Sequence, residues 1–200
     1  MLRITVLISG GGTNLQALID RIADGTICDA RIESVISSDP KAYGLVRAEK
    51  AGIPAAAVVP GDFRKREDFE KALIGKVQES SPGLIVLAGY LVRIPAEMIR
   101  LYPRRIINIH PSLIPSFCGK GYYGRKVHEA ALARGVKVTG ATVHYVNEEL
   151  DGGPILKQKA VEIPDGITAE ELQKLVMKEA EWVILPQAVA EIASSGKERQ

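Results

Sequence analysis

Ile106-Ile107-Asn108-Ile109-His110-Pro111-Ser112-Leu113-Ile114-Pro115 is the stretch that decides how this chain is organised. Its apolar start is typical of a buried strand, and Pro111 moves His110 away from helical backbone angles. Asn108 and His110 lie two positions apart, so an extended chain presents both side chains on one side of a sheet. Ligands bind at the carboxyl ends of strands in open α/β sheets, and two convergent donors can hold an oxygen that gains negative charge. The stretch therefore predicts a catalytic site at the end of a central strand.

Strand and helix patterns alternate on both sides of this stretch. We predict further strands at 4–8, 30–38, 53–59, 84–88, 138–146 and 155–163, and helices at 15–22, 42–51, 66–80, 95–101, 125–134 and from 168 onward. Helical crossovers imply parallel pairing, and the last strand can pair antiparallel with its predecessor at an edge. The predicted fold is α/β: a Rossmann-like, open, mostly parallel, twisted sheet of about seven strands with helices on both faces.

The C-terminal helix carries three local signals. Thr168 and Glu171 have the spacing of a capping box, which marks the start of a helix. Pro186 is expected to kink this helix, because proline lacks an amide hydrogen for the helical ladder. We expect residues 194–200 to form a frayed tail.

Composition narrows the class of protein. The 200 residues are 46% hydrophobic and 25% charged, which suits one globular domain, and the net charge of +2 argues against a nucleic-acid or membrane surface. No apolar run reaches the roughly 18 residues of a membrane span, and the N-terminus resembles a strand start rather than a signal peptide. Cys28 and Cys118 lack the spacing of a metal site, so we expect a reducing cytoplasm and no metal.

A glycine-rich turn, Ser9-Gly10-Gly11-Gly12-Thr13-Asn14, separates the first strand from the first helix. Backbone amides of such a turn and the positive end of the helix attract an anion. The turn lacks the Gly-Lys-Ser/Thr of a P-loop, and Leu15 stands where a dinucleotide fingerprint needs a third glycine or alanine. A tight turn without a ligand is an equal alternative, although Thr13 and Asn14 add hydrogen-bonding groups that favour a small phosphate.

Three separated segments together resemble one enzyme family. They are Ser9 to Gln16, Asn108 to Pro115, and Leu150-Asp151-Gly152-Gly153-Pro154-Ile155. The segments are similar to those of the phosphoribosylglycinamide formyltransferases (glycinamide ribonucleotide transformylases), which belong to the 10-formyltetrahydrofolate-dependent formyltransferases. The resemblance covers nearly the whole chain. The second and third segments are shared by the wider group of 10-formyltetrahydrofolate enzymes, whereas the first is more particular to the glycinamide ribonucleotide enzymes.

The resemblance implies a role for each matching residue. The catalytic residues would be Asn108, His110 and Asp151: the first two stabilise the oxyanion that forms when an amine attacks a formyl carbon, and the third favours the protonated imidazole. The ribonucleotide side would be formed by Gly12, Thr13, Asn14, Lys178 and Glu181. The folate side would be formed by Arg66, Leu91, Val92, Arg93, Ile94, Asn108, Asn147, Glu148, Glu149, Leu150 and Asp151.

The same resemblance implies the partners and the organisation of the chain. The formyl donor would be 10-formyltetrahydrofolate, a cosubstrate that needs no metal, and the acceptor would be glycinamide ribonucleotide of purine biosynthesis. One domain would span residues 1–200, with 1–100 as the ribonucleotide-binding half and 101–200 as the folate and catalytic half. The enzyme would act on small molecules, as a monomer or homodimer in the cytoplasm. Two departures concern the folate side: Val92 stands where relatives commonly carry an arginine, here Arg93, and the loop 117–124 differs.

Several of these residues also have a purely structural interpretation. Lys178 and Glu181, three apart on a helix, could form a solvated ion pair, and Asp151 could be a turn aspartate before glycines. We predict that His128 lies at the surface and that His144 has a packing or supporting role.

Two other functions remain open from the sequence. Another 10-formyltetrahydrofolate enzyme could be a deformylase or could act on a different amine acceptor, such as initiator methionyl-tRNA. We would expect an added N-terminal regulatory domain in the first and an added C-terminal domain with a basic surface in the second. An inert phosphate-sensing module would keep the glycine-rich turn but has no need of Asn108, His110 and Asp151 together.

Overall fold

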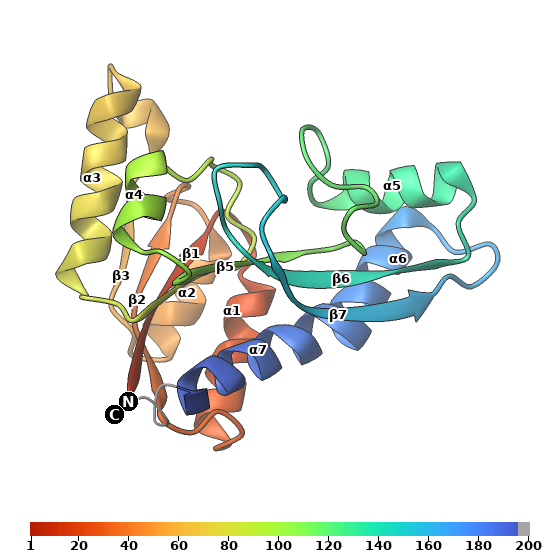
Figure 1. The fold of residues 1–200 in the computed structure, drawn as a ribbon, viewed down its shortest axis with the longest axis horizontal. Helices are drawn as coiled ribbons and strands as arrows, with labels where there is room; N and C mark the ends of the chain where they lie inside the picture. The colour runs from red at the N-terminus through yellow and green to blue at the C-terminus, as the bar shows by residue number, and fades with distance from the viewer. Residues whose placement is uncertain (196–200) are drawn as a thin grey trace.

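Residues 1–195 are described by the computed structural model, in which seven strands form one sheet (Figure 1). The strands are β1 Leu2–Ile8, β2 Ala30–Ser37, β3 Ala55–Ala57, β4 Leu84–Leu87, β5 Ile106–His110, β6 Val138–Tyr145 and β7 Ile155–Glu162. Their order across the sheet is β3-β2-β1-β4-β5-β6-β7. Strands β1 to β5 pair parallel, and β6 runs antiparallel to both β5 and β7. The predicted fold class is confirmed, including the antiparallel pairing of the last two strands. The antiparallel pairing of β5 with β6 was not predicted.

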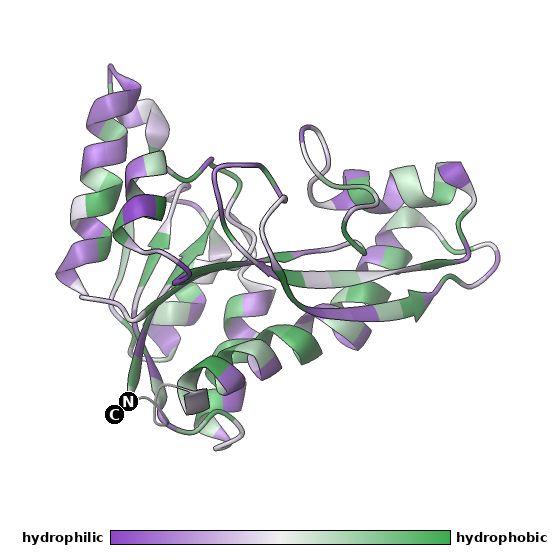
Figure 2. Cartoon of the chain, in the orientation of Figure 1, coloured by the Kyte–Doolittle hydropathy of each residue, from purple (hydrophilic) through white to green (hydrophobic). Residues whose placement is uncertain are grey.

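Helices cover both faces of the sheet. They are α1 Thr13–Ala23, α2 Tyr43–Lys50, α3 Arg66–Glu79, α4 Ala96–Leu101, α5 Arg125–Arg134, α6 Ala169–Val176 and α7 Trp182–Ser195. Helices α1, α2, α6 and α7 pack on one face and α3 and α4 on the other, so the sheet separates two apolar cores. Figure 2 shows the expected pattern, with hydrophobic strands inside and hydrophilic residues along α3.

The alternation of β5 determines where its polar side chains point. Ile107 and Ile109 lie in the core beneath α1, α6 and α7, whereas Ile106 lies in the core beneath α3 and α4. Successive residues of a strand point to opposite faces, so Asn108 and His110 project on the side of Ile106, as predicted. The apolar core on that side draws on β1, β2, β4 and only the first residue of β5. The carboxyl end of β5 is therefore polar on this face.

The direction in which the chain crosses the sheet reverses between β1 and β4, and such a switch point is where open α/β sheets bind ligands. The glycine-rich turn follows β1, and Gly89 follows β4 at the same edge. Ser9 joins the two turns: its amide donates to the carbonyl oxygen of Gly89 at 3.1 Å, and its Oγ accepts from the amide of Leu91 at 2.9 Å. The two turns therefore form one connected rim at the carboxyl ends of the strands.

The predicted strand at 53–59 is shorter in the structure, where β3 comprises only Ala55–Ala57. Pro54 has no amide hydrogen for a ladder, and Pro60 begins a 3-10 turn. No helix among residues 1–195 is long and apolar enough to cross a membrane.

The C-terminal helix also differs from the prediction. A π-helical turn, Met177–Glu181, separates α6 from α7 and ends before Pro186, where we had predicted the irregularity itself. The capping box of Thr168 and Glu171 is present. Of the predicted tail 194–200, the first two residues end α7, and residues 196–200 lie outside the described part of the chain.

Candidate active site

Four polar side chains lie together on one face where β5 and β6 pair. The register places Asn108 opposite His144 and His110 opposite Thr142. Directly opposite residues of an antiparallel pair point to the same side of the sheet. Thr142, His144 and His110 are only 0%, 2% and 5% exposed, so the cluster is a polar layer in the interior.

A hydrogen bond between Asn108 and His144 orients the amide of Asn108. The Asn108 Nδ2 and His144 Nε2 atoms are 3.1 Å apart, and His144 Nδ1 lies 3.0 Å from the carbonyl oxygen of Tyr145. A carbonyl oxygen only accepts, so Nδ1 carries the hydrogen and Nε2 accepts from the amide. Burial lowers the pKa of His144, which keeps this ring neutral. One amide hydrogen of Asn108 is thus occupied, and the second can donate elsewhere.

Asp151 reaches the same cluster from the loop between β6 and β7. Its Oδ2 lies 3.8 Å from Nδ1 of His110, and its Oδ1 lies 3.8 Å from Nε2 of His144. Oδ2 also accepts a hydrogen bond from the amide of Gly119 at 2.8 Å. The structure therefore brings together Asn108, His110 and Asp151, which lie in separate segments of the sequence.

The backbone of this loop explains how Asp151 is held. Asp151 has a φ of 55°, in the left-handed region that aspartate tolerates better than most residues. A Cβ at Gly153 would lie 1.8 Å from the carbonyl oxygen of Tyr145, so only glycine lets the loop pass this close to β6. The aspartate is a turn residue, and the same turn directs its carboxylate at the two histidines.

His110 has one ring nitrogen held by the protein and one that faces a carboxylate. Nε2 lies 3.0 Å from the carbonyl oxygen of Phe117, so this nitrogen carries the hydrogen of the neutral ring. Nδ1 faces Asp151 and is the nitrogen that can take up a further proton. The loop 117–124 thus borders the imidazole through Phe117 and the carboxylate through Gly119.

Thr142 belongs to the cluster although the sequence analysis did not select it. Its Oγ donates to the carbonyl oxygen of Ser112 at 2.7 Å and accepts from the amide of Ile114 at 3.1 Å. Thr142 therefore anchors the chain as it leaves β5. In the sequence, Thr142 and His144 alternate with apolar residues, which indicates that their side chains share one face of a strand. This pattern does not show which neighbouring strand contributes side chains to the same face.

The prediction that His128 lies at the surface was wrong. His128 is fully buried in α5, and neither ring nitrogen has a hydrogen-bond partner among the described residues. Burial, and then the charge of His110, lower the pKa of His128 to about 4, so the ring is neutral at physiological pH. The charged neighbours Lys126 and Glu129 suggested an exposed position, but His128 lies with Val127 and Ala131 on the buried face of α5.

The glycine-rich turn packs against the start of α2. Gly12 has a φ of 69°, and a Cβ there would lie 2.6 Å from the Cα of Gly44. A Cβ at Gly10 or Gly11, by contrast, would meet no atom within 4 Å. Packing therefore requires only one of the three glycines, and the other two leave the backbone unobstructed at the N-terminus of α1.

A buried carboxyl group meets this turn from the other end of the chain. Nδ2 of Asn14 donates to Oε2 of Glu181 at 2.6 Å, and Glu181 is 6% exposed. Burial raises the pKa of Glu181 to about 7, although the hydrogen bond from Asn14 acts in the opposite direction. Lys178 is exposed and does not share a face with Glu181, because both belong to the π turn and not to a regular α-helix.

We expect Glu181 to make the protein less stable as the pH rises. Its ordinary pKa of 4.5 becomes about 7 in the folded chain, so the folded state holds a proton that the unfolded state has released. The free energy of unfolding should fall between these two pH values, by at most about 3 kcal/mol. Urea titrations across this range should show the fall for the wild type and a flatter profile for Glu181→Gln. Equal slopes in the two proteins would contradict the assignment.

The residues predicted on the folate side lie mainly in two loops that contact each other. Nη2 of Arg93 donates to the carbonyl oxygen of Glu148 at 3.0 Å. Leu91 and Leu150, one in each loop, are 62% and 55% exposed. The two loops thus present apolar side chains beside a charged contact at the rim of the polar cluster.

The neighbouring predicted residues are placed differently. Ile94 is buried in the core beneath α3 and α4, and Val92 packs against the same core. Arg66 begins α3, where its Nε lies 2.6 Å from Oε1 of Glu70. The structure thus explains why this chain has valine at 92, where relatives commonly carry an arginine. Val92 supports the loop by packing on the core, and Arg93 makes the polar contact with Glu148.

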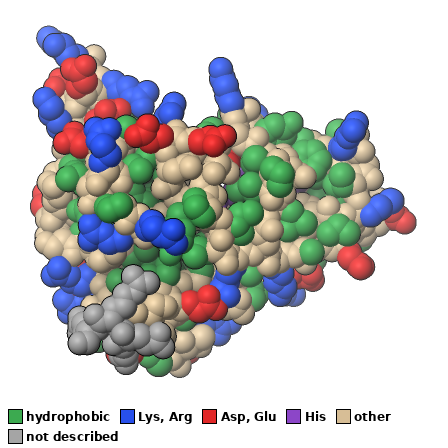
Figure 3. Space-filling view, in the orientation of Figure 1, with side chains coloured by type: hydrophobic (Ala, Val, Ile, Leu, Met, Phe, Trp, Pro, Cys, Tyr) green, Lys and Arg blue, Asp and Glu red, His purple; other side chains and the backbone are tan. Residues whose placement is uncertain are grey.

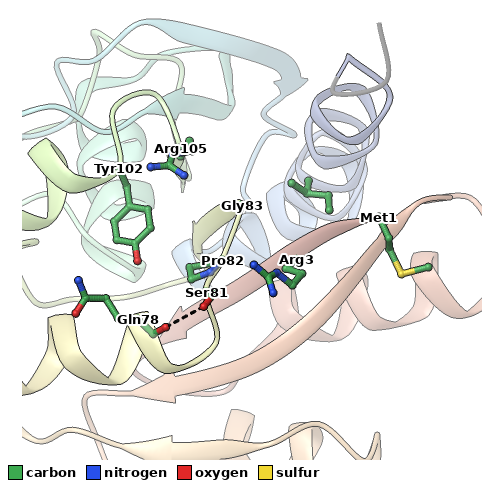
Figure 4. A pocket seen from close by; sticks show the side chains of 9 residues that line it. Met1, Arg3, Gln78, Ser81, Pro82, Gly83, Tyr102 and Arg105 are labelled. Atoms are coloured by element: carbon green, nitrogen blue, oxygen red, sulfur yellow. Dashed lines mark hydrogen bonds between the residues drawn. The ribbon is translucent and has the colours of Figure 1, made fainter. Parts of the chain in front are cut away.

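A cavity of about 590 Å³ lies at the opposite, amino ends of the strands (Figure 4). It is lined by residues such as Arg3, Gly83 and Arg105, and it contains none of the predicted site residues.

Acidic and basic side chains are interspersed on the face shown in Figure 3. Within residues 1–195, no group of three or more His, Cys, Asp or Glu residues is arranged to hold a metal ion.

Comparison with known proteins identifies relatives along nearly the whole chain. The formyl transferase family profile matches residues 2–189. Phosphoribosylglycinamide formyltransferase of Haemophilus influenzae is 41% identical over 93% of this chain and 84% of that protein. The trifunctional purine biosynthetic protein adenosine-3 of Bos taurus is 41% identical over 96% of this chain, which spans only 18% of that protein's length. The crystal structure of glycinamide ribonucleotide transformylase 1 from Symbiobacterium toebii has a TM-score of 0.91 at 42% identity, covering 98% of this chain and 89% of that one.

Proposed function

The chain belongs to the formyl transferase family, among the phosphoribosylglycinamide formyltransferases, and we propose that it transfers a formyl group from 10-formyltetrahydrofolate to the amine of glycinamide ribonucleotide. The products are N-formylglycinamide ribonucleotide and tetrahydrofolate. The observation that carries this proposal is the meeting of Asn108, His110 and Asp151 in one polar layer beside the switch point of the sheet.

The proposed reaction forms a bond between the amine nitrogen and the formyl carbon and breaks the bond between that carbon and the folate nitrogen. As the neutral amine attacks, the formyl oxygen gains negative charge, which the free amide hydrogen of Asn108 and protonated His110 stabilise. The proton lost by the amine must reach the departing folate nitrogen. Protonated His110 can give the proton on its Nδ1 to that nitrogen, and the carboxylate of Asp151, which faces Nδ1, can accept the proton lost by the amine and pass it back to the ring.

His144 supports this chemistry by positioning Asn108. Its Nε2 accepts one amide hydrogen of Asn108, and its Nδ1 is held by the carbonyl oxygen of Tyr145. The asparagine side chain therefore cannot reverse its nitrogen and oxygen without losing this bond. A donor that is already oriented before the reaction needs no reorganisation when the oxyanion forms.

We assign the ribonucleotide phosphate to the glycine-rich turn, where Gly12, Thr13 and Asn14 stand at the N-terminus of α1. Lys178, on the exposed side of the π turn, suits the phosphate as well, and the buried Glu181 suits ribose hydroxyls or the amine. Both groups lie at the carboxyl end of the sheet, where the glycine-rich turn and the π turn meet through the bond between Asn14 and Glu181.

Replacing Asn14 with alanine should weaken binding of the ribonucleotide more than binding of the folate. Asn14 lies beside the predicted phosphate site and holds Glu181, so its loss removes one contact and leaves a buried carboxyl group unpaired. We expect the Kd for glycinamide ribonucleotide to rise about tenfold or more. Isothermal titration calorimetry measures both ligands, with the exposed Asp20→Asn on the same helix as control. A larger loss for the folate would place the phosphate elsewhere.

We place the pteridine end of the donor against the two contacting loops, with Leu91, Val92, Arg93 and Ile94 in one. The other loop contributes Asn147, Glu148, Glu149, Leu150 and Asp151. Exposed leucines suit an aromatic ring, and backbone amides and carbonyls suit its polar edge. Arg66 would lie on the same side, although its present partner is Glu70 within α3.

One assay tests the proposed function directly. Glycinamide ribonucleotide and 10-formyltetrahydrofolate are supplied together, and the absorbance of the folate is followed as the formyl group leaves. Turnover that requires both substrates supports the proposal. Release of formate from 10-formyltetrahydrofolate in the absence of the ribonucleotide would indicate a deformylase. Binding of the ribonucleotide without any turnover would indicate a sensing module.

The same proposal includes a cytoplasmic location, with small molecules as partners. Cys28 and Cys118 are free cysteines, as suits a reducing compartment.

A further inference from the structure

We propose that Pro186 is a positioning residue for the ribonucleotide: it maintains the π turn Met177–Glu181, which directs the side chain of Glu181 to Asn14. This inference rests on the proposed function, because it concerns how the acceptor side of that site is built. In this proposal Pro186 acts through the shape of the helix that carries Glu181.

The spacing of buried residues shows why this helix needs an irregular turn. The positions Leu172, Val176, Ala180, Ile184 and Ala188 are all buried, at intervals of four residues. Four residues of an α-helix turn about 400°, so a buried row with this spacing drifts by about 40° at each step. A turn with more residues per revolution reverses part of that drift. The π turn therefore keeps α6 and α7 buried on one common side of the sheet.

The hydrogen bonds of the turn confirm its geometry. The amide of Trp182 donates to the carbonyl oxygen of Met177, five residues earlier, as a π-helix requires. At the glycine-rich turn, Oγ of Thr13 donates to Sδ of Met177 at 3.6 Å, and Asn14 donates to Glu181. The first and last residues of the π turn thus contact the first two residues of α1.

Pro186 explains why the irregular turn lies at this place. An α-helical ladder would join the amide of residue 186 to the carbonyl oxygen of Trp182, but proline has no amide hydrogen and its ring repels that carbonyl. Trp182 is the first residue of α7, so the regular ladder is interrupted where the π turn ends. Pro186 is itself buried, so its ring also packs in the core. The position of Glu181, five residues before the proline, follows from this interruption.

The π turn sets the direction in which the side chain of Glu181 leaves the helix. One residue of an α-helix corresponds to about 100° of rotation, so converting the π turn to α-helix would turn Glu181 away from its present direction. Glu181 is the one ionisable residue among the buried positions of the π turn and the two helices joined to it. Its bond to Asn14 would be lost while the loops around Asn108 and His110 stayed in place.

The test is a set of Michaelis constants for Pro186→Ala, with the exposed neighbour Gln187→Ala as control. We expect the KM for glycinamide ribonucleotide to rise about tenfold in Pro186→Ala, the loss of one hydrogen bond. The KM for 10-formyltetrahydrofolate and kcat should stay within about threefold of the wild type, because the folate loops and the Asn108, His110 and Asp151 cluster keep their places. An unchanged KM for the ribonucleotide, or an equal rise of both constants, would overturn the proposal.

A crystal structure distinguishes a changed π turn in Pro186→Ala from a general loss of stability. A crystal structure of Pro186→Ala should show α-helical bonding through 177–181 and a lengthened distance between Asn14 and Glu181; a retained π turn would refute the role of the proline. If the variant does not fold, Pro186→Ser is measured in the same way, because serine also restores the amide hydrogen. Absence of turnover in the wild type would instead refute the proposed function.

Discussion

Replacing His110 with alanine is expected to lower kcat/KM for formyl transfer by about 10³-fold while the protein stays folded. His110 is the residue of the polar layer that can both donate to an oxyanion and carry a proton. Its Nε2 is held by Phe117 and its Nδ1 faces Asp151, so the ring is already oriented in the absence of substrate. Alanine removes both functions and leaves the strand ladder intact, because the backbone of β5 pairs independently of this side chain.

The control for this variant is a second buried histidine. His128 lies in α5 without a hydrogen-bond partner among the described residues, and burial lowers its pKa to about 4, so its ring is neutral and is not needed as a donor in the proposed chemistry. His128→Leu should fold, because leucine avoids the cost of burying an unpaired imidazole, and should keep turnover within about threefold. Circular dichroism and thermal unfolding establish folding, and the folate absorbance assay measures turnover. Near-wild-type activity of folded His110→Ala would remove His110 from the mechanism.

Replacing Asp151 with asparagine should lower kcat by about 10²-fold or more with little change in either KM. Asparagine has the same shape and can still accept the hydrogen bond from the amide of Gly119, so the loop should keep its conformation. What it loses is the negative charge 3.8 Å from Nδ1 of His110. Protonation of that imidazole then loses its stabilising partner, and the proton has no path towards the departing nitrogen.

Steady-state kinetics separate this role from a structural one. In folded Asp151→Asn, kcat should fall while the KM for each substrate stays close to the wild-type value, because the carboxylate acts on proton transfer and not on binding. Asp165→Asn, which removes an exposed carboxylate paired with Lys137, should leave kcat unchanged. A wild-type kcat in folded Asp151→Asn would show that the carboxylate only shapes the loop.

The parallel pairing of β1 to β5 and the shared face of Asn108 and His110 were predictable because both follow from local patterns. Apolar runs separated by helices imply a parallel sheet, and a two-residue interval implies a shared face. The burial of His128 was not predictable, because it depends on which face of α5 is turned towards the rest of the fold. The π turn was also missed, since an interval of four buried residues is common to regular and irregular helices.

The amino-acid sequence by itself determined the fold class, the strand that presents Asn108 and His110, and, through its resemblance to a family, the residues to look for. These features depend on periodicity and on short motifs, which act between neighbours in the chain. Only the tertiary structure decided that Asp151 stands 3.8 Å from His110, that His144 orients Asn108, and that Glu181 meets Asn14. Such meetings depend on the register of antiparallel strands and on the packing of a distant helix, which join residues that no local pattern relates.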